Sequence, residues 1–521
     1  MHSVHKSSHE HQPVANDWQK LSPIAIVYFV MKIIRGVFAN IVYLIPALAY
    51  SYSNIIAYPY IWLPILLISF TALLLGAFWS FQVYRFRLSD NVLEIRSGLF
   101  RKKHVNLPFE RIQNVKIEQP LYYRLTGYAC LQLDTAGSAK QEAQLVALPL
   151  MLAQQLKQQI LRVSPESSAP FSAAPTHAKD SYPPFATDEQ LINQRSLPDL
   201  VLHGITNNRV WILLGGLAPF YDNIVNKINI LLMDLGINLN DMFNLQVHSL
   251  WQVGIYTLSL TLVIMFLLML FSVTGAIISY YGYTLSKTEN RYIRRSGLFT
   301  KHEVSMPLSR LQMLVQQQDW LDILLKRVNL KLEQMNARLK QADHSAANNK
   351  IIVPSITLTQ SRAIIDDIYP NNQLANVSFS AISGFFMLRY IGYYLFPLCC
   401  LIQSIAIIKH NIALAAIGLV LFALLSTLVF LRWRRWGYAF DENFVYLRKG
   451  LLGVDYYCFP AFKVQQCQFK QSIMMKRRHL ATVKYVLASG AITIPLMPET
   501  IALGLINRCL YQVESSQRSW M

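Results

Sequence analysis

Three polar residues inside an otherwise apolar stretch are the first candidates for chemistry in this sequence. Asp222, Asn226 and Lys227 follow Arg209 closely, in a segment that is otherwise apolar enough to enter a membrane. Hydrocarbon offers polar groups no partners, so a carboxylate, an amide and an amine at that depth would mark a path for an ion or a substrate. An amphipathic segment lying on the outer membrane surface explains the same residues. The sequence supports both interpretations of this intramembrane polar site.

Short runs of basic residues are the second group of candidates. Each Lys or Arg close to a membrane surface adds about 1 kcal/mol of attraction to anionic lipid. The same charges also fit a solvated face, because the cytoplasmic side of a membrane protein retains Lys and Arg. The candidates for contact with lipid or with a partner are Arg101, Lys102, Lys103, Arg294, Arg295, Arg448, Lys449, Lys476, Arg477 and Arg478.

Motifs for catalysis and metal binding are not found in the sequence. It contains no phosphate-binding loop, no serine nucleophile elbow and no zinc-binding helix motif. The six cysteines include no CxxC pair, and most fall in segments that we place in the cytoplasm, where thiols stay reduced. Four histidines near the N-terminus have no scaffold, so a disordered tail is favoured over a metal site. We therefore expect no enzymatic activity, no cofactor and no bound metal.

Composition indicates the class of protein. Hydrophobic residues make up 53% of the chain and charged residues 15%, which is typical of an integral membrane protein. The formal net charge of +19 arises from 48 Lys and Arg against 29 Asp and Glu. Because the basic residues gather next to apolar segments, membrane topology accounts for them, and we expect no nucleic-acid partner.

A Gly–Pro–Gln pattern occurs three times and organises the chain. In each copy the proline follows the glycine by ten positions and the glutamine follows it by fifteen, with a basic residue two positions before the glutamine. An ungapped recurrence of this kind predicts three similar structural units. The residues are Gly98, Pro108, Arg111 and Gln113, then Gly297, Pro307, Arg310 and Gln312, and finally Gly450, Pro460, Lys463 and Gln465.

Each copy lies in a polar segment that follows two long apolar arms. Alternating apolar and polar residues predict strands in these segments, and an amphipathic run at the end of each predicts one helix. The fold class is therefore an α+β membrane protein with three repeats of a transmembrane helical hairpin and a β module, giving six transmembrane helices. The predicted ranges are a disordered tail (1–20), hairpins 1 to 3 (21–81, 197–280 and 371–433), modules 1 to 3 (82–163, 281–370 and 434–515) and a Pro/Ser-rich linker (164–196).

Loop charge predicts the orientation in the membrane. Basic residues follow the hairpins, as Arg85 and Arg87 do after hairpin 1, whereas the turns between arms contain almost none. The positive-inside rule therefore places the N-terminus and all three modules in the cytoplasm of a multi-pass protein. The location that we expect is the cytoplasmic (inner) membrane of a bacterium.

The repeated frame, in which YRFRLSDNVLEIRSGLF leads to LPFERIQNV, resembles the bacterial pleckstrin-homology-like (PH-like) membrane domain family of the YdbS/YdbT type. This resemblance implies a β-sandwich or split barrel with a C-terminal helix in each module. It also implies roles in envelope stress, secretion or resistance to membrane-active peptides, and a small membrane partner with one repeat of the same kind. The motif residues would be structural, with glycine in a tight turn and proline at a strand end. The third copy has Lys463 where the others have arginine, which loses any bidentate contact.

Two functions are compatible with these observations. In the first, a non-enzymatic membrane protein presents three cytoplasmic modules for assembly with a partner or with itself, for anionic lipid binding, or for both. In the second, the hairpins line the path of an exporter or channel, and the intramembrane polar site supplies its polar groups.

Overall fold

The computed structural model describes residues 18–39, 58–89, 91–98, 102–135, 143–163, 189–207, 230, 233–234, 249–288, 291–334 and 351–515. The chain forms two compact units. Unit 1 comprises Met1–Ala186 and Phe299–Ser305, and unit 2 comprises Thr187–Leu298 and Met306–Met521. The intramembrane polar site of Asp222, Asn226 and Lys227 lies outside the described residues, as does Arg101.

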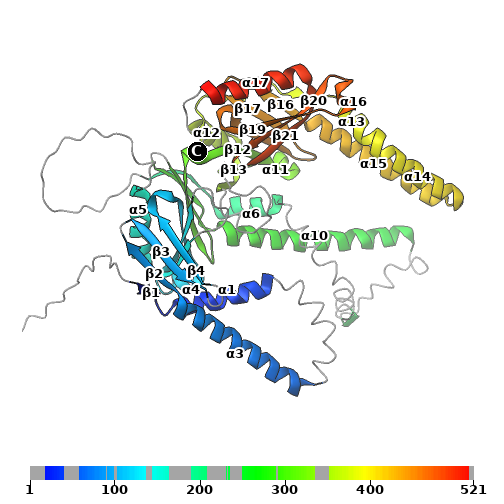
Figure 1. The fold of residues 1–521 in the computed structure, drawn as a ribbon. Helices are drawn as coiled ribbons and strands as arrows, with labels where there is room; N and C mark the ends of the chain where they lie inside the picture. The colour runs from blue at the N-terminus through cyan, green and yellow to red at the C-terminus, as the bar shows by residue number, and fades with distance from the viewer. Residues whose placement is uncertain are drawn as a thin grey trace, which may run out of the picture. The chain divides into compact units, whose positions relative to one another are not determined.

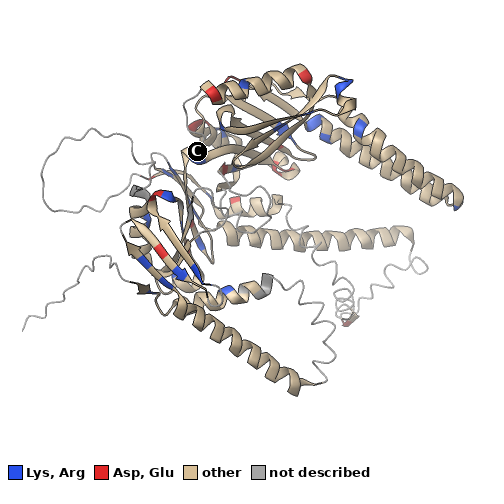
Figure 2. Ribbon diagram, viewed as in Figure 1, with Lys and Arg blue, Asp and Glu red and all other residues tan. Residues whose placement is uncertain are grey.

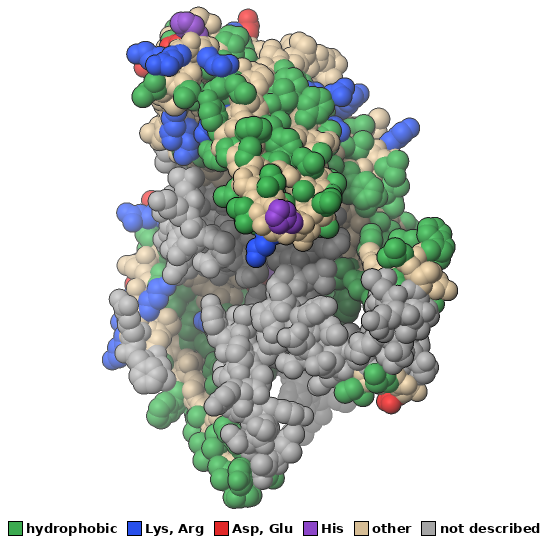
Figure 3. Space-filling model, turned by 90° about the vertical axis from the view of Figure 1, so that its right-hand side faces the viewer, with side chains coloured by type: hydrophobic (Ala, Val, Ile, Leu, Met, Phe, Trp, Pro, Cys, Tyr) green, Lys and Arg blue, Asp and Glu red, His purple; other side chains and the backbone are tan. Residues whose placement is uncertain are grey.

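Four described helical segments are long and apolar enough to cross a membrane. Most of their large apolar side chains are exposed (Figure 3), because packing inside the protein covers little of them. Lys and Arg are sparse along these helices and gather on the modules (Figure 2). The segments are α3 (Pro59–Val83), α10 (Leu250–Tyr280), the continuous run of α13 (Phe385–Met387), the π-helical η6 (Leu388–Leu395) and α14 (Phe396–Ile408), and α15 (Ile412–Arg435).

Unit 1 contains module 1, with two antiparallel sheets, and part of hairpin 1 (Figure 1). Its core includes Tyr123, Leu131 and Ile160, and it also takes in Phe29 of the helix that precedes the first span. The first sheet has the order β1 (Gln19–Lys20), β2 (Arg85–Ser89), β3 (Val92–Ser97) and β4 (Lys103–Pro108). The second contains β7 (Ala143–Pro149), β6 (Tyr128–Thr135), β5 (Ile112–Gln119) and β11 (Lys301–Pro307) as neighbours, and the helices are α1 (Ala25–Ala39), η1 (Phe109–Arg111), α4 (Leu121–Arg124) and α5 (Leu150–Val163).

Unit 2 contains most of module 2, all of module 3 and the helices of hairpins 2 and 3. Strands β8 (Gln190–Gln194), β9 (Thr284–Thr288) and β10 (Arg291–Ser296) are consecutive neighbours. One sheet has the order β14 (Ile351–Thr357), β13 (Arg327–Gln334), β12 (Leu311–Gln318), β18 (Val454–Pro460), β17 (Phe444–Lys449), β16 (Gly437–Phe440) and β15 (Ser380–Ala381). Another has the order β19 (Val464–Lys470), β20 (Leu480–Leu487) and β21 (Gly490–Pro498). The shorter helices are α6 (Leu197–Thr206), η4 (Leu308–Arg310), α11 (Trp320–Leu324), α12 (Leu358–Ile368), η7 (Ala461–Lys463), α16 (Ile473–Lys476) and α17 (Glu499–Ser515).

Neighbouring modules share a sheet. Strand β12 of module 2 pairs with β18 of module 3, so that Val315 lies opposite Tyr457. Two side chains of β12, Met313 and Val315, also belong to the hydrophobic core of module 3. In unit 1, β5 of module 1 pairs with β11, which continues the sequence of module 2. A module is therefore not an isolated barrel, because its later strands extend the sheet of the module that follows.

The boundaries predicted for the tail and the linker are wrong in part. Gln19 and Lys20 form β1 and pair with β2, and residues 190–194 of the predicted linker form β8 and pair with β9. Ser380–Ala381 similarly precedes the span of hairpin 3 and pairs with β16. Each module thus receives a short strand from the chain that precedes its hairpin. Strands of two to five residues at a sheet edge give no periodic signal, which is why the sequence pattern did not reveal them.

A bulge that recurs in all three modules fastens the starts of hairpins 2 and 3 to their modules. Ala147, Ser355 and Leu496 occupy the same place in β7, β14 and β21, and all three have positive φ angles, of 54°, 46° and 52°. Such a conformation turns the backbone out of the ladder. The carbonyl of Leu496 accepts a hydrogen bond of 3.0 Å from the backbone N–H of Ser383, two residues before the span. In module 2, the carbonyl of Ser355 accepts a hydrogen bond of 3.3 Å from Arg195, which precedes the first helix of hairpin 2.

Candidate interaction sites

The basic residues predicted to contact lipid or a partner have different environments. Lys102 and Lys103 are exposed at the start of β4. Arg294, in contrast, is buried on β10. Arg295 holds both carboxylate oxygens of Glu189 at 2.7 and 2.9 Å. Arg294 and Arg295 therefore both lie on strand β10, and Arg294 is covered by protein.

Arg448 and Lys449 also have structural partners. The Arg448 Nε donates a hydrogen bond of 3.2 Å to the carbonyl of Arg435, the last residue of α15, and the guanidinium lies 5.2 Å from the ring centre of Phe379. The Lys449 ammonium lies 4.3 Å from the ring centre of Tyr457, and burial lowers its pKa despite the nearby carboxylate of Asp455. Arg448 therefore connects the end of a span to module 3, whereas Lys449 packs on an aromatic ring within module 3.

Lys476, Arg477 and Arg478 form the exposed basic cluster of module 3. They follow two exposed apolar residues of α16, Ile473 and Met474, whose exposed fractions are 79% and 53%. The α16 helix lies against the start of a span. The Tyr393 hydroxyl approaches the Met474 sulfur at 3.6 Å, and the Arg478 guanidinium lies 4.5 Å from the ring centre of Phe385. Since Phe385 and Tyr393 belong to the span of residues 385–408, α16 presents both apolar and basic groups beside a membrane helix.

The same position is exposed and apolar in all three modules. Leu121 begins α4, Trp320 begins α11 and Ile473 begins α16, and each follows the motif glycine by 23 positions. Leu121 and Trp320 have exposed fractions of 48% and 49%. These short helices were not predicted from the sequence. The signal that could have found them is the constant spacing of a large apolar residue after the repeated glutamine.

The motif glycines lie in turns that require glycine. Gly98 and Gly297 have φ angles of +102° and +120°, which side chains disfavour. Gly450 is required for a different reason, because a Cβ there would lie 2.1 Å from the Gly453 carbonyl oxygen. Pro108, Pro307 and Pro460 each end a strand and precede one turn of 3₁₀ helix.

The basic residue of the motif contributes to the junction between modules. The Lys463 ammonium of module 3 is buried and donates hydrogen bonds to the carbonyls of Ser309, at 2.7 Å, and Leu311 in module 2. Burial lowers the pKa of Lys463 to about 8. Arg310 is also buried, whereas Arg111, in the first module, is exposed. The motif glutamines also differ in burial, since Gln312 is fully buried on β12 and Gln465 is exposed on β19. The side chain of Gln113 is not among those that the structure describes.

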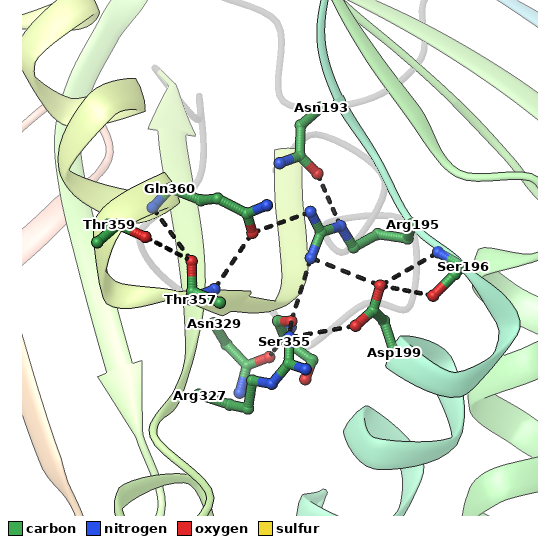
Figure 4. A network of polar contacts seen from close by, with 10 residues as sticks. All are labelled: Asn193, Arg195, Ser196, Asp199, Arg327, Asn329, Ser355, Thr357, Thr359 and Gln360. Atoms are coloured by element: carbon green, nitrogen blue, oxygen red, sulfur yellow. Dashed lines mark hydrogen bonds and ion pairs between the residues drawn. The ribbon is translucent and has the colours of Figure 1, made fainter.

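A buried arginine network attaches hairpin 2 to module 2 (Figure 4). Arg195, just before α6, donates to the Asn193 side chain at 2.7 Å, the Ser355 carbonyl at 3.3 Å and the Gln360 side chain at 3.1 Å. Asp199 lies 3.8 Å from the same guanidinium and accepts a hydrogen bond of 3.1 Å from Arg327. Burial lowers the pKa of Arg195, and the carboxylate opposes that effect. Each nitrogen of the Arg195 guanidinium faces a protein acceptor, which indicates a structural joint rather than a ligand site.

One apolar cavity of about 790 Å³ lies in unit 2, beside α10. Its lining includes Met265 and Phe266 of α10, Trp320 of α11, Gly453 of the turn before β18, and Asp455 of β18 itself. Burial raises the pKa of Asp455. Among the described residues, the lining comes from hairpin 2 and from modules 2 and 3.

Comparison with known proteins agrees with the threefold repeat. The model of a family described as "Bacterial PH domain" matches residues 33–164, 242–366 and 386–513. The chain is 23% identical over 231 residues to the "UPF0699 transmembrane protein YdbT" of Bacillus subtilis (strain 168). That alignment covers 44% of this chain and 45% of the relative, so the chain spans about half the length of the relative that it matches. No solved structure matches the chain significantly.

Proposed function

Because the chain belongs to the bacterial PH domain family, we propose that it is a non-enzymatic membrane scaffold whose modules bind anionic lipid and assemble with partner protein. The proposal includes six spans, formed by the four described helices and by the first arms of hairpins 1 and 2. It also includes an inner-membrane location with the modules in the cytoplasm. The basic residues at the module end of α15, Arg432, Arg434 and Arg435, support that orientation.

The position of α16 is the observation that carries the lipid proposal. Its exposed Ile473 and Met474 lie beside a span, and three exposed cations follow directly. Apolar side chains that insert at the boundary between headgroups and acyl chains, with basic residues next to them, are the usual means of binding an anionic membrane surface. Trp320 at the equivalent place in module 2 supports the proposal, because tryptophan favours the membrane interface.

A fluorophore at position 473 tests the proposal in the full-length protein. The label is attached to Ile473→Cys, in a chain whose native cysteines are replaced, and the protein is reconstituted in nanodiscs. Emission at this position should shift to the blue when phosphatidylglycerol replaces part of the phosphatidylcholine. The shift should be lost on reversing the charge of Lys476, Arg477 and Arg478, and it should weaken in high salt.

A label at Tyr511, an exposed residue on α17, is the matched control and should respond to neither lipid. Emission at position 473 that is the same in both lipids, with and without the basic cluster, would contradict lipid binding by α16.

A further inference from the structure

The two junctions within this chain use the same pairing register. In both β11 and β18, the residue six positions before the motif proline lies opposite the last residue of the partner strand. At the first junction Lys301 lies opposite Gln119, and at the second Val454 lies opposite Gln318. One position further along, His302 lies opposite Glu118 and Asp455 lies opposite Gln317. The His302 ring and the Glu118 carboxylate are 3.4 Å apart. Each junction therefore places complementary polar groups at this position.

Strand β19 is the third member of this series, and within the described part of the chain it pairs only with β20. The motif spacing makes Lys470 the equivalent of Glu118 and Gln317, and Phe469 the equivalent of Gln316. Both Lys470 and Phe469 are exposed. An exposed edge strand with a large aromatic residue is a template for an added strand.

We propose that β19 binds an antiparallel strand of a partner protein that carries a carboxylate opposite Lys470 and an aromatic side chain opposite Phe469. This inference rests on the proposed function and specifies its assembly interface. Strand β18 shows that the geometry is available, since Asp455 and the neighbouring Tyr456 occupy these two positions opposite β12. Cross-strand pairs of opposite charge and of aromatic rings stabilise a sheet.

The charges argue against a second copy of this chain as the occupant. The free edge of module 1 is β4, which within the described residues pairs only with β3. In the common register its Lys103 would lie opposite Lys470, and His104 would lie opposite Phe469. Like charges directly opposite each other destabilise a sheet. The side chains beside the edge also differ between the two strands. Strand β19 has Gln466 and Gln468 at the positions where β12 has the core residues Met313 and Val315. A strand that docks on β19 therefore does not complete an apolar core.

A peptide with the sequence of residues 453–460 is the probe, with Cys458 replaced by serine. Its binding is measured by fluorescence anisotropy with the full-length protein in phosphatidylcholine nanodiscs, so that anionic lipid plays no part. We expect saturable binding that weakens by about tenfold when the peptide carries Asp455→Lys, the order expected when a cross-strand pair changes from attractive to repulsive. The protein variant Lys470→Glu should reverse the preference and bind the Lys peptide more tightly.

Lys484→Glu is the matched control, because it makes the same charge change on β20 of the same sheet, away from the free edge. It should leave the preference for the Asp peptide intact. Absence of saturable binding, or binding that does not change with the charge at 455 and 470, would overturn the proposal. The lipid response at position 473 is measured separately, so either proposal can fail without the other.

A cysteine pair tests the second copy directly. Asn106 would lie opposite Cys467 in the common register, so Asn106→Cys would form a disulfide with Cys467 if β4 and β19 paired. We expect no such disulfide in the single variant Asn106→Cys, which keeps Lys103. We expect the disulfide to form in the double variant Asn106→Cys, Lys103→Glu. A disulfide that forms as readily with Lys103 in place would overturn the choice of partner.

Discussion

Lys463 shows how one residue of the repeat serves two modules. Its ammonium group, on module 3, donates to two backbone carbonyls of module 2, and the surrounding protein covers it. A buried cation is costly unless hydrogen bonds replace its water. An arginine at this place stays charged at all accessible pH values, whereas a lysine can lose its proton. The replacement of arginine by lysine in the third copy therefore makes this junction sensitive to pH.

Stability should rise with pH from about 8 to 10.5 because of Lys463. Burial lowers the pKa of this group from 10.5 to about 8, so the unfolded chain binds a proton that the folded chain has lost. The cost of burying the charge is fully present below pH 8 and disappears as the pH approaches 10.5. The slope from one such group is at most about 1.4 kcal/mol per pH unit. The measurement is the thermal midpoint in nanodiscs at several pH values, for the wild type and for Lys463→Arg. The wild type should gain stability relative to that variant, and parallel curves would contradict the assignment.

The turn between β17 and β18 shows how the repeat specifies an element. A Cβ added at Gly450 would meet the Gly453 carbonyl oxygen, and a Cβ at Gly453 would meet the carbonyl oxygen of Gln318 at 2.3 Å. The second contact is with module 2, so the turn must be thin for the modules to share a sheet. Glycine is therefore required for two separate reasons, at Gly450 by the tight turn itself and at Gly453 by the close approach of two backbones.

Gly450→Ala should therefore lower the free energy of unfolding by more than about 2 kcal/mol, since rigid backbone must shift to make room. Gly504→Ala is the matched control. Gly504 lies within α17 with no atom within 4 Å of an added Cβ, so alanine should stabilise the helix by about 0.5–1 kcal/mol. The thermal midpoints of the two variants should therefore move in opposite directions. A loss of stability in both would contradict the steric argument.

The whole molecule is connected through its sheets. Strand β12 belongs to module 2 in sequence, pairs with β18 of module 3 and supplies side chains to the core of module 3. A sheet cannot open on one side without exposing backbone groups on the other. Modules 2 and 3 should therefore open as one cooperative unit, although each has its own copy of the repeat.

A destabilising change in module 3 should consequently be felt in module 2. Ile494 is fully buried on β21, and Ile494→Ala should cost about 2–5 kcal/mol. Hydrogen exchange in the full-length protein should accelerate at amides of β20 and also at amides of β12. Ile412→Ala is the control, because its exposed side chain lies at the start of α15 and its loss should leave both strands unchanged. Faster exchange that is confined to module 3 would show that the modules open independently.

The sequence predicted the features that depend on local pattern. Repetition of Gly98, Pro108 and their equivalents indicated three modules, and long apolar runs indicated α3, α10, α14 and α15. Pairing between modules was not predicted, because strand alternation shows which face is buried and not which strand lies alongside. The burial of Arg294 and Lys463 was missed for the same reason. Exposed Ile473 and Met474 on α16 were missed because four residues are too few for a helical period.

The common register of the junctions also bears on the history of the gene. Recombination between corresponding points of two neighbouring repeats would remove or add one whole unit. Because β11 and β18 dock in the same way, the strand newly brought next to β5 or β12 would meet it in the register that the old neighbour used. Gain or loss of a unit would thus preserve the pairing register at the junctions and change the number of hairpins and modules together.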